Sequence, residues 1–232
     1  MIVSTLNCTG LASFPKKLVV RRLVDDQRID VFFLQEIMGD GHVIAGEMEV
    51  LLSSWTFISF DAKGRSGGLL LGWRTRLFHF LSAWVVESGL FASFFSIEMK
   101  EAFCFMNIYG PYLDRERFWN NIFTLDCLKN TKLILGGDLN FSVGFFEIWG
   151  ARARVDSLSS FFSSSGKIDA FGLVDIAPSV IVPTWSNRRV GIDSISKRLD
   201  RLFVSADLLD LDLHFRQWVG CGGDSDHQPV FL

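Results

Sequence analysis

Short apolar runs recur along the chain, and most of them end at a polar side chain that is costly to bury. The alternating run Ile2–Leu6 ends at Asn7, and the continuous run Val31–Leu34 ends at Gln35 and Glu36. Runs of this kind are typical of strands, and none approaches the ~20 apolar residues that a membrane-spanning helix needs. Ligands of layered α/β folds bind in crevices beside strand ends. We therefore expect these polar residues to gather at one rim.

Helices are predicted between several of the strands. The spacing of apolar residues predicts helices over Lys16–Gln27, Arg115–Lys129 and Val155–Ser163, and a further helix that closes at Met48–Leu52. Turn residues separate the strands in the middle of the chain, as in strands that pair with their sequence neighbours. This mixture favours mixed sheets with covering helices over a parallel array. The remaining predicted strands are Trp55–Phe60, Gly68–Trp73, Phe78–Val86, Phe91–Ile97, Phe103–Ile108, Leu133–Leu135, Leu199–Val204 and Val230–Leu232.

Length and composition indicate one globular domain. The 232 residues show no internal repeat and no domain boundary, so we expect a single domain over residues 1–232. The 23 phenylalanines predict a large aromatic core. A net charge of −3 argues mildly against nucleic-acid binding, unless local clusters of Lys and Arg make the contact.

The N-terminus and the cysteines indicate where the protein is located in the cell. The chain opens without the basic and apolar segments of a secretory signal. Its four cysteines form no C-x-x-C pair and have no His at zinc-ligand spacing, which favours reduced thiols. We therefore expect a nuclear or cytoplasmic protein that is not secreted and does not enter a membrane.

Each polar strand end also has a structural explanation when it is taken alone. A strand-end Asn or Asp is usually a turn or cap residue. Glu36 could open a solvated helix, and Tyr109 could belong to a simple turn. A lone histidine such as His227 is more often a satisfied side chain than a catalyst. The functional case therefore rests on the set and its order.

That ordered set resembles the endonuclease/exonuclease/phosphatase superfamily, over nearly the whole chain. Single elements are weak, whereas the succession of GDLN, LDR and SDH is specific. The motifs are Asn7-Cys8-Thr9-Gly10, Leu34-Gln35-Glu36, Asn107-Ile108-Tyr109-Gly110-Pro111, Gly137-Asp138-Leu139-Asn140, Leu199-Asp200-Arg201 and Ser225-Asp226-His227. The resemblance implies an α/β fold of the DNase-I-like kind, a four-layer αββα sandwich of two mixed β-sheets covered by helices.

A narrower resemblance is to the endonuclease domain of plant non-LTR (LINE-type) retrotransposons. It is carried by Gly67–Trp73, Tyr109-Gly110-Pro111, Phe118-Trp119, Thr184–Asn187 and Arg198–Leu202. It implies that the chain nicks DNA, and that in a full-length element a reverse transcriptase domain uses the new 3′-hydroxyl as a primer. No such domain follows here, so the chain is either an isolated domain or a fragment of an element. We expect a monomer.

The resemblance also implies a role for each polar strand end in phosphodiester hydrolysis. Glu36 and Asp226 would hold Mg²⁺, with Mn²⁺ as a substitute. Asp138 would orient or deprotonate the attacking water, and either Asp138 or His227 would serve as the general base. Asp200 would fix the tautomer of His227 and support its charge. Asn7 would position Glu36 or the phosphate. Tyr109 would contact the phosphate or the leaving oxygen. Asn140 and His227 would donate hydrogen bonds to the phosphate oxygens.

A second segment is implied at the DNA-binding face. Thr184, Trp185, Asn187 and Arg188 would bind substrate, with a core tryptophan beside a turn as the equal alternative. Nearby basic residues would line a phosphate-binding face or belong to a solvated loop. They are Arg188, Arg189, Lys197, Arg198 and Arg201.

The sequence departs from the superfamily pattern at two positions, and it leaves rival functions open. Thr9 stands where some members have an acidic residue, and Pro183 stands where an aromatic is more usual. The same core serves abasic-site repair nucleases and inositol or lipid phosphatases, because a fold does not fix a substrate. A catalytically inactive retroelement relic is the third alternative, although its site residues would then be intact by chance.

Overall fold

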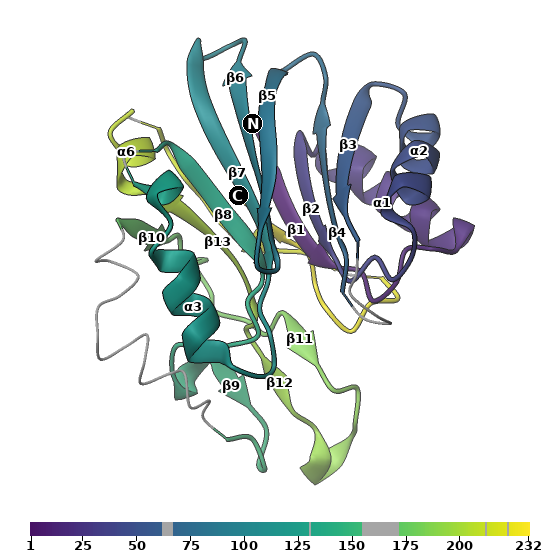
Figure 1. Ribbon diagram of the computed structural model, residues 1–232. Coiled ribbons are helices and arrows are strands. Elements are labelled where there is room, and N and C mark those ends of the chain that lie inside the picture. Colours follow the sequence, from purple (N-terminus) through teal and green to yellow (C-terminus); the bar gives the residue numbers. More distant parts are fainter. Residues whose placement is uncertain (62–66, 130, 155–171, 212, 222) are drawn as a thin grey trace.

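Two six-stranded sheets pack face to face, with helices on both outer sides (Figure 1). The computed structural model describes residues 1–61, 67–129, 131–154, 172–211, 213–221 and 223–232. The helix predicted over Val155–Ser163 lies outside these residues. Within the described residues, no helix is both long enough and apolar enough to cross a membrane.

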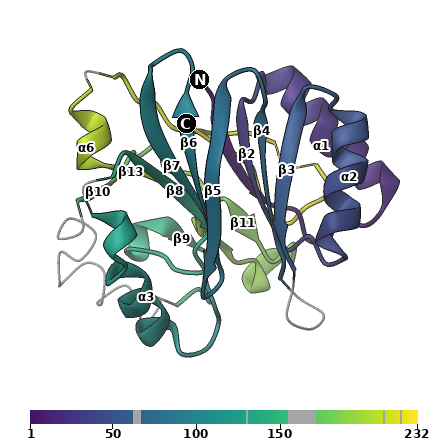
Figure 2. The same ribbon diagram turned by 45° about the horizontal axis from the view of Figure 1, so that its top comes forward.

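The first sheet holds the N-terminal and C-terminal strands together. Its order is β14-β15-β1-β2-β4-β3, and only β1 and β2 of its neighbouring strands run parallel. Helices α1 (Phe14–Gln27) and α2 (Gly41–Leu51) cover its outer face (Figures 1 and 2). The strands are β1 (Val3–Asn7), β2 (Val31–Gln35), β3 (Trp55–Phe60), β4 (Leu69–Arg74), β14 (Trp218–Val219) and β15 (Val230–Phe231).

The second sheet has the order β10-β13-β8-β7-β6-β5, and the parallel pair β7 and β8 is joined by the covering helix α3 (Arg115–Phe123). Its strands are β5 (Phe78–Val86), β6 (Gly89–Ser96), β7 (Glu101–Tyr109), β8 (Leu133–Asp138), β10 (Leu173–Asp175) and β13 (Asp200–Ser205). A short sheet below it contains β9 (Ile148–Trp149), β11 (Trp185–Ser186) and β12 (Ser196–Lys197). The short helices are η1 (Asp126–Leu128), η2 (Phe145–Glu147), η3 (Gly191–Asp193) and α6 (Ala206–Leu209).

The alternation of side chains along each strand explains the layers. In β2, Val31 and Phe33 face the second sheet, whereas Phe32 and Leu34 face α1 and α2. The strands of the second sheet divide their side chains in the same way between the intersheet core and α3. Buried phenylalanines occur in the apolar cluster between the two sheets and in the clusters between each sheet and its covering helices. The predicted aromatic core is therefore confirmed.

Most predicted elements lie within a few residues of the observed ones, and two expectations were wrong. The helix predicted over Arg115–Lys129 ends at Phe123, since Thr124 is its C-cap and the backbone becomes extended at Leu125. The strands in the middle of the chain do not all pair with their neighbours. The chain leaves the first sheet after β4 and enters the second sheet at β5.

A polar contact joins the two sheets inside the apolar layer. The Asn107 amide of β7 donates to the carbonyls of Leu34 and Leu70, each at 3.0 Å. Gln35 Nε2 donates to Asn107 Oδ1 at 2.6 Å. All of these side chains are buried, so the hydrogen bonds compensate for the desolvation of the amides. They fix the spacing of the sheets near the strand ends that carry the polar residues.

Candidate active site

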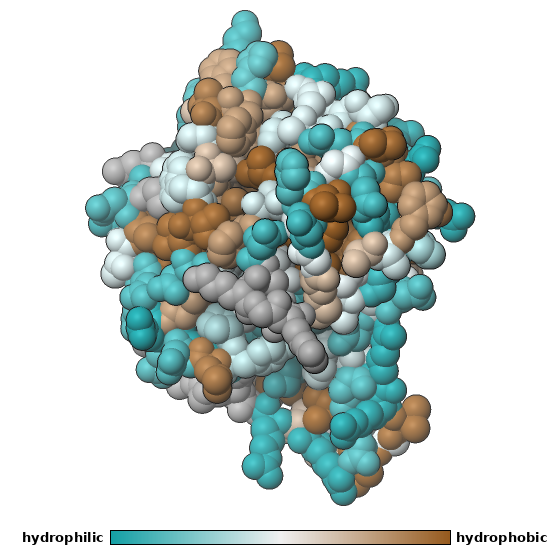
Figure 3. All heavy atoms as spheres, turned by 45° about the vertical axis from the view of Figure 1, so that its right-hand side comes forward, coloured by the Kyte–Doolittle hydropathy of each residue, from teal (hydrophilic) through white to brown (hydrophobic). Residues whose placement is uncertain are grey.

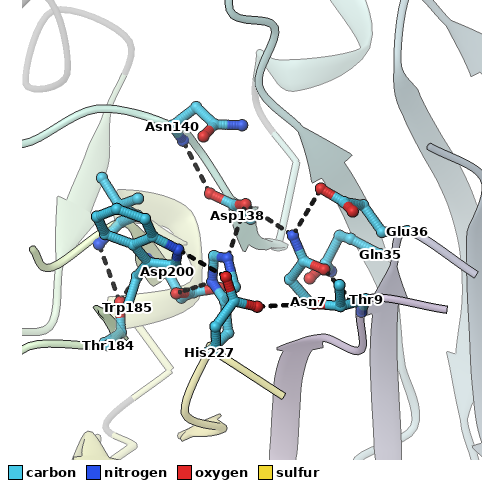
Figure 4. Close-up of polar contacts among 12 residues, drawn as sticks. Asn7, Thr9, Gln35, Glu36, Asp138, Asn140, Thr184, Trp185, Asp200 and His227 are labelled. Carbon is cyan, nitrogen blue, oxygen red and sulfur yellow. Dashed lines mark hydrogen bonds and ion pairs between the residues drawn. The ribbon is translucent and has the colours of Figure 1, made fainter. Parts of the chain in front are cut away.

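The polar strand ends meet at one rim of the sandwich, as the sequence predicts (Figure 4). Parallel pairing places Asn7 beside Gln35 in the first sheet and Tyr109 beside Asp138 in the second. Asp200 pairs with Asp138 across β13 and β8. The register of the strands therefore assembles side chains that lie far apart in the sequence.

Asn7 bridges the two sheets at this rim. Its Nδ2 donates to Glu36 Oε1 at 3.1 Å and to Asp138 Oδ2 at 2.9 Å, and Tyr109 also donates to Glu36 Oε1. Glu36 has a φ of 52°, a left-handed conformation that costs a non-glycine residue about 1–3 kcal/mol. Burial, followed by the contact with Glu36, raises the pKa of Tyr109 well above its usual range, so the phenol stays protonated.

His227 lies between two buried carboxylates. Its Nδ1 is 2.9 Å from Asp200 Oδ2, and its Nε2 is 3.6 Å from Asp138 Oδ2. Burial alone would lower the pKa of His227, but the charges of Asp200 and Asp138 outweigh it and raise the pKa to about 10. Burial raises the pKa of Asp138 to about 6, against the opposing effect of His227. Near neutral pH the site therefore holds an imidazolium beside the ionised carboxylate of Asp138.

Asn140 follows Asp138 in a tight turn. Its backbone N–H donates to Asp138 Oδ1 at 3.0 Å, and its side chain donates to the Gly110 carbonyl at 2.6 Å. The turn depends on Gly137, which has a φ of 149° and where a Cβ would lie 1.8 Å from the Ile108 carbonyl oxygen. The sequence Gly137-Asp138-Leu139-Asn140 therefore has a steric reason for its glycine.

The carboxylate of Asp226 accepts hydrogen bonds from two side chains beside this array. Thr9 Oγ1 donates to its Oδ1 at 2.8 Å, and Trp185 Nε1 donates to its Oδ2 at 3.0 Å. Burial would raise the pKa of Asp226, but the bond from Thr9 and the charge of His227 lower it. Ser225 donates to the Asn7 carbonyl at 2.6 Å and accepts from the His227 N–H at 3.1 Å. Sequence reasoning assigned no role to Thr9 or Ser225, although both lie inside the quoted motifs.

The predicted DNA-binding segment divides into buried and exposed parts. Thr184 is fully buried, and its hydroxyl accepts from the backbone N–H groups of Leu199 and Asp200, each at 2.9 Å. Asn187 donates to the Asp193 carbonyl at 2.8 Å and thereby closes the β11–β12 hairpin. Arg188 is exposed. Thr184 and Asn187 thus hold the backbone, while Arg188 is accessible from solvent.

The β11–β12 hairpin projects from the rest of the molecule. At the bottom of Figure 3, where this hairpin ends in Figure 1, hydrophilic side chains project with hydrophobic ones between them. Arg188, Arg189, Val190 and Ile192 are exposed there, and Lys197 is half-buried.

Arg198 and Arg201 do not belong to a basic surface. Both guanidinium groups are buried and form ion pairs with Glu147 and Asp175. Arg198 lies 2.8 Å from each carboxylate, and Arg201 lies 2.5 Å from Asp175. Both sequence interpretations, a phosphate-binding face and a solvated loop, are therefore wrong for these two residues. Their partners come from η2 and β10, which the sequence did not reveal.

The donor set suits a hard divalent cation. Glu36, Asp138 and Asp226 offer carboxylate oxygens, the ligands that Mg²⁺ prefers. Asp138, Asp200 and His227 also bring one ligand atom each to within 4.8 Å of one another. His227 Nδ1 already lies against Asp200, and the other oxygen of that carboxylate, Oδ1, is buried without a hydrogen-bond partner in the part of the chain that the structure describes. The residues present fit a metal centre.

Solved structures with the same fold include proteins that act on DNA. The Neisseria 3′ phosphatase NExo, bound to a product DNA hairpin, has a TM-score of 0.78 and 18% identity, covering 100% of this chain and 98% of that one. The endonuclease domain of TRAS1, a telomere-specific non-LTR retrotransposon, has a TM-score of 0.71 and 17% identity, covering 99% and 96%. The AP endonuclease of Leishmania major has a TM-score of 0.75 and 16% identity, covering 99% and 86%. The expected four-layer DNase-I-like fold is thus confirmed.

The family assignment comes from the sequence comparison. No curated protein matches the chain. Residues 3–227 match the model of the Endonuclease/Exonuclease/phosphatase family, whose members are nucleases and phosphoesterases that hydrolyse phosphodiester bonds and generally depend on a divalent metal. The match spans nearly every residue that forms the sandwich and its polar rim, and the chain belongs to the endonuclease/exonuclease/phosphatase family.

Proposed function

We propose that the protein is a Mg²⁺-dependent endonuclease that nicks DNA, of the kind used by LINE-type retrotransposons. The observation that carries the proposal is the buried array of Asp200, His227, Asp138, Asn7 and Glu36, in which each side chain contacts the next. The similarity to the TRAS1 endonuclease fold supports the retrotransposon assignment.

Glu36 is the proposed metal ligand, and Asp226 completes or steers the ligand shell. A bound Mg²⁺ supplies charge neutralisation for the phosphate and the leaving oxygen. Asn7 and Tyr109 both donate to Glu36 Oε1, so they set the orientation of that carboxylate. Thr9 and Trp185 do the same for Asp226.

Asp138 is the proposed general base, because His227 carries a proton near neutral pH. The ionised Asp138 takes a proton from the water that attacks phosphorus, and the P–O3′ bond breaks. The leaving 3′-oxygen takes a proton from solvent, so the products are a 5′-phosphate and a 3′-hydroxyl. The imidazolium of His227 donates to a phosphate oxygen while Asp200 holds its Nδ1–H. Asn140 and Arg188 are proposed to contact the DNA backbone, and Thr184 to hold Asp200 in place.

Nicking of supercoiled plasmid by the purified chain tests the proposal. We expect nicking with Mg²⁺ or Mn²⁺ and none with EDTA. His227→Ala and Glu36→Gln should each lose at least ~10²-fold in rate, the usual cost of removing a positioned catalytic group. The matched controls are His79→Ala and Glu98→Gln, because His79 and Glu98 are exposed and lie away from the rim.

A substrate panel separates the proposal from its rivals. It contains plasmid, a duplex with one abasic site, a duplex with a 3′-phosphate and an inositol phosphate. Faster cleavage of one of the last three by the wild-type chain would replace the DNA-nicking assignment. A cooperatively folded wild-type chain that cleaves none of them would show an inactive relic.

A further inference from the structure

The distribution of tyrosine in the chain is informative. The sequence has 23 phenylalanines and only two tyrosines, and both tyrosines lie in the segment Tyr109–Tyr112 at the active-site rim. A phenol needs a polar partner where a phenyl ring does not. Tyr109 uses its hydroxyl to donate to Glu36. The second phenol, Tyr112, has no place in the mechanism described above.

Tyr112 lies beside the catalytic centre. Its electrostatic neighbours include Tyr109, Asp138 and Glu36. Burial, followed by the charge of Asp138, raises the pKa of Tyr112, so the phenol stays neutral. The residue as a whole is nevertheless 71% exposed. An aromatic side chain this exposed beside the catalytic centre is available to a ligand.

Residues on both sides of Tyr112 contact the turn after β8. The Gly110 N–H donates to the Asp138 carbonyl at 2.8 Å, and the Gly110 carbonyl accepts from Asn140 Nδ2 at 2.6 Å. A Cβ at Gly110 would lie 2.1 Å from the Leu139 carbonyl oxygen, so the two segments are in close contact. On the other side, the Arg115 guanidinium donates to the Asn140 carbonyl. Tyr112 is therefore presented from a rigid segment beside the proposed general base.

We propose that Tyr112 is a substrate-binding residue whose ring stacks on the nucleoside next to the scissile phosphate. The inference rests on the proposed function, since it requires a nucleic-acid substrate. Every base offers a π-face, so stacking on a tyrosine gives affinity without a fixed sequence.

The test compares three variants of the full chain. Tyr112→Ala removes the ring, Tyr112→Phe keeps the ring and removes the hydroxyl, and Leu113→Ala is the matched control because Leu113 is the next residue and is 82% exposed. The Kd for a fluorescein-labelled DNA duplex is measured in EDTA, where no cleavage occurs. We expect Tyr112→Ala to weaken binding by about 5- to 150-fold, the effect of one stacked base. Tyr112→Phe and Leu113→Ala should stay within about twofold of wild type.

A spectroscopic measurement separates stacking from a general structural role. Once the nicked position is mapped, 2-aminopurine is placed on either side of it. The wild-type chain and Tyr112→Phe should change its fluorescence on binding, and Tyr112→Ala should not. If wild type binds and nicks DNA while Tyr112→Ala has the same Kd and fluorescence change, the role of Tyr112 is refuted and the nuclease assignment stands. If wild type neither binds nor nicks DNA, the proposed function itself fails.

Discussion

Glu147→Ala should be among the most destabilising single changes in the protein. Glu147 is buried and accepts from the guanidinium groups of Arg198 and Arg201 and from the Val143 N–H. Its removal leaves two buried cations whose one remaining charged partner among the described residues is Asp175. Breaking a buried ion pair by removing one partner costs about 3–5 kcal/mol. For a domain of this size, that loss lowers the melting temperature by roughly 6–20 °C.

Urea denaturation followed by tryptophan fluorescence measures this effect. The control is Glu101→Ala, which removes a partly exposed pair with Lys132 at 2.6 Å and should cost no more than ~1 kcal/mol. Glu147→Leu combined with Arg198→Met, Arg201→Leu and Asp175→Asn should regain stability, since all four charges of the cluster are then removed and well-packed uncharged residues can replace a buried ionic cluster. A cost below ~1 kcal/mol for Glu147→Ala would show that the cluster contributes no more than a surface pair, and the reasoning would be refuted.

Three further outcomes are expected. Burial would raise the pKa of Asp175, but Arg201 and Arg198 outweigh it and lower the pKa. The stability that Asp175 contributes is therefore complete above the ordinary carboxyl pKa of ~3.9 and is lost as pH falls through the pKa of the folded state. Asp175→Asn should weaken the dependence of the urea midpoint on acid pH. Asn7→Ala removes the donor shared by two carboxylates and should slow nicking by about 10²-fold, as gel assays can show. Gly137→Ala should cost more than ~4 kcal/mol, because its Cβ would overlap the Ile108 carbonyl oxygen, and the same urea titration measures it.

The sequence predicted the strands and the polar rim because both are encoded locally. Apolar alternation locates a strand such as Trp55–Phe60, and the polar residue that follows marks where burial ends. The end of α3 was missed because the apolar stripe continues beyond Phe123 with Leu125 and Leu128, whereas the backbone becomes extended at Leu125.

The surroundings of the site could not be predicted in the same way. Arg198 and Arg201 look like a basic surface in the sequence, since their carboxylate partners lie on other elements and meet them only after folding. The contacts of Thr9 and Ser225 likewise join chain segments more than two hundred residues apart. Motif spacing gives the residues that meet at a rim, whereas the side chains that orient them follow from tertiary packing.

The hydrogen bonds of Asn107 with Gln35, Leu34 and Leu70 align the two sheets, and the proposed catalytic centre depends on that alignment. Glu36 and Asn7 are carried by one sheet, and Tyr109 and Asp138 by the other. Neither sheet holds a complete site. A shift of one sheet relative to the other by less than the length of a side chain would therefore separate the carboxylates without unfolding either sheet. Apolar contacts hold the two sheets together but are non-directional, whereas the hydrogen bonds of the buried Asn107 amide are directional and align the sheets.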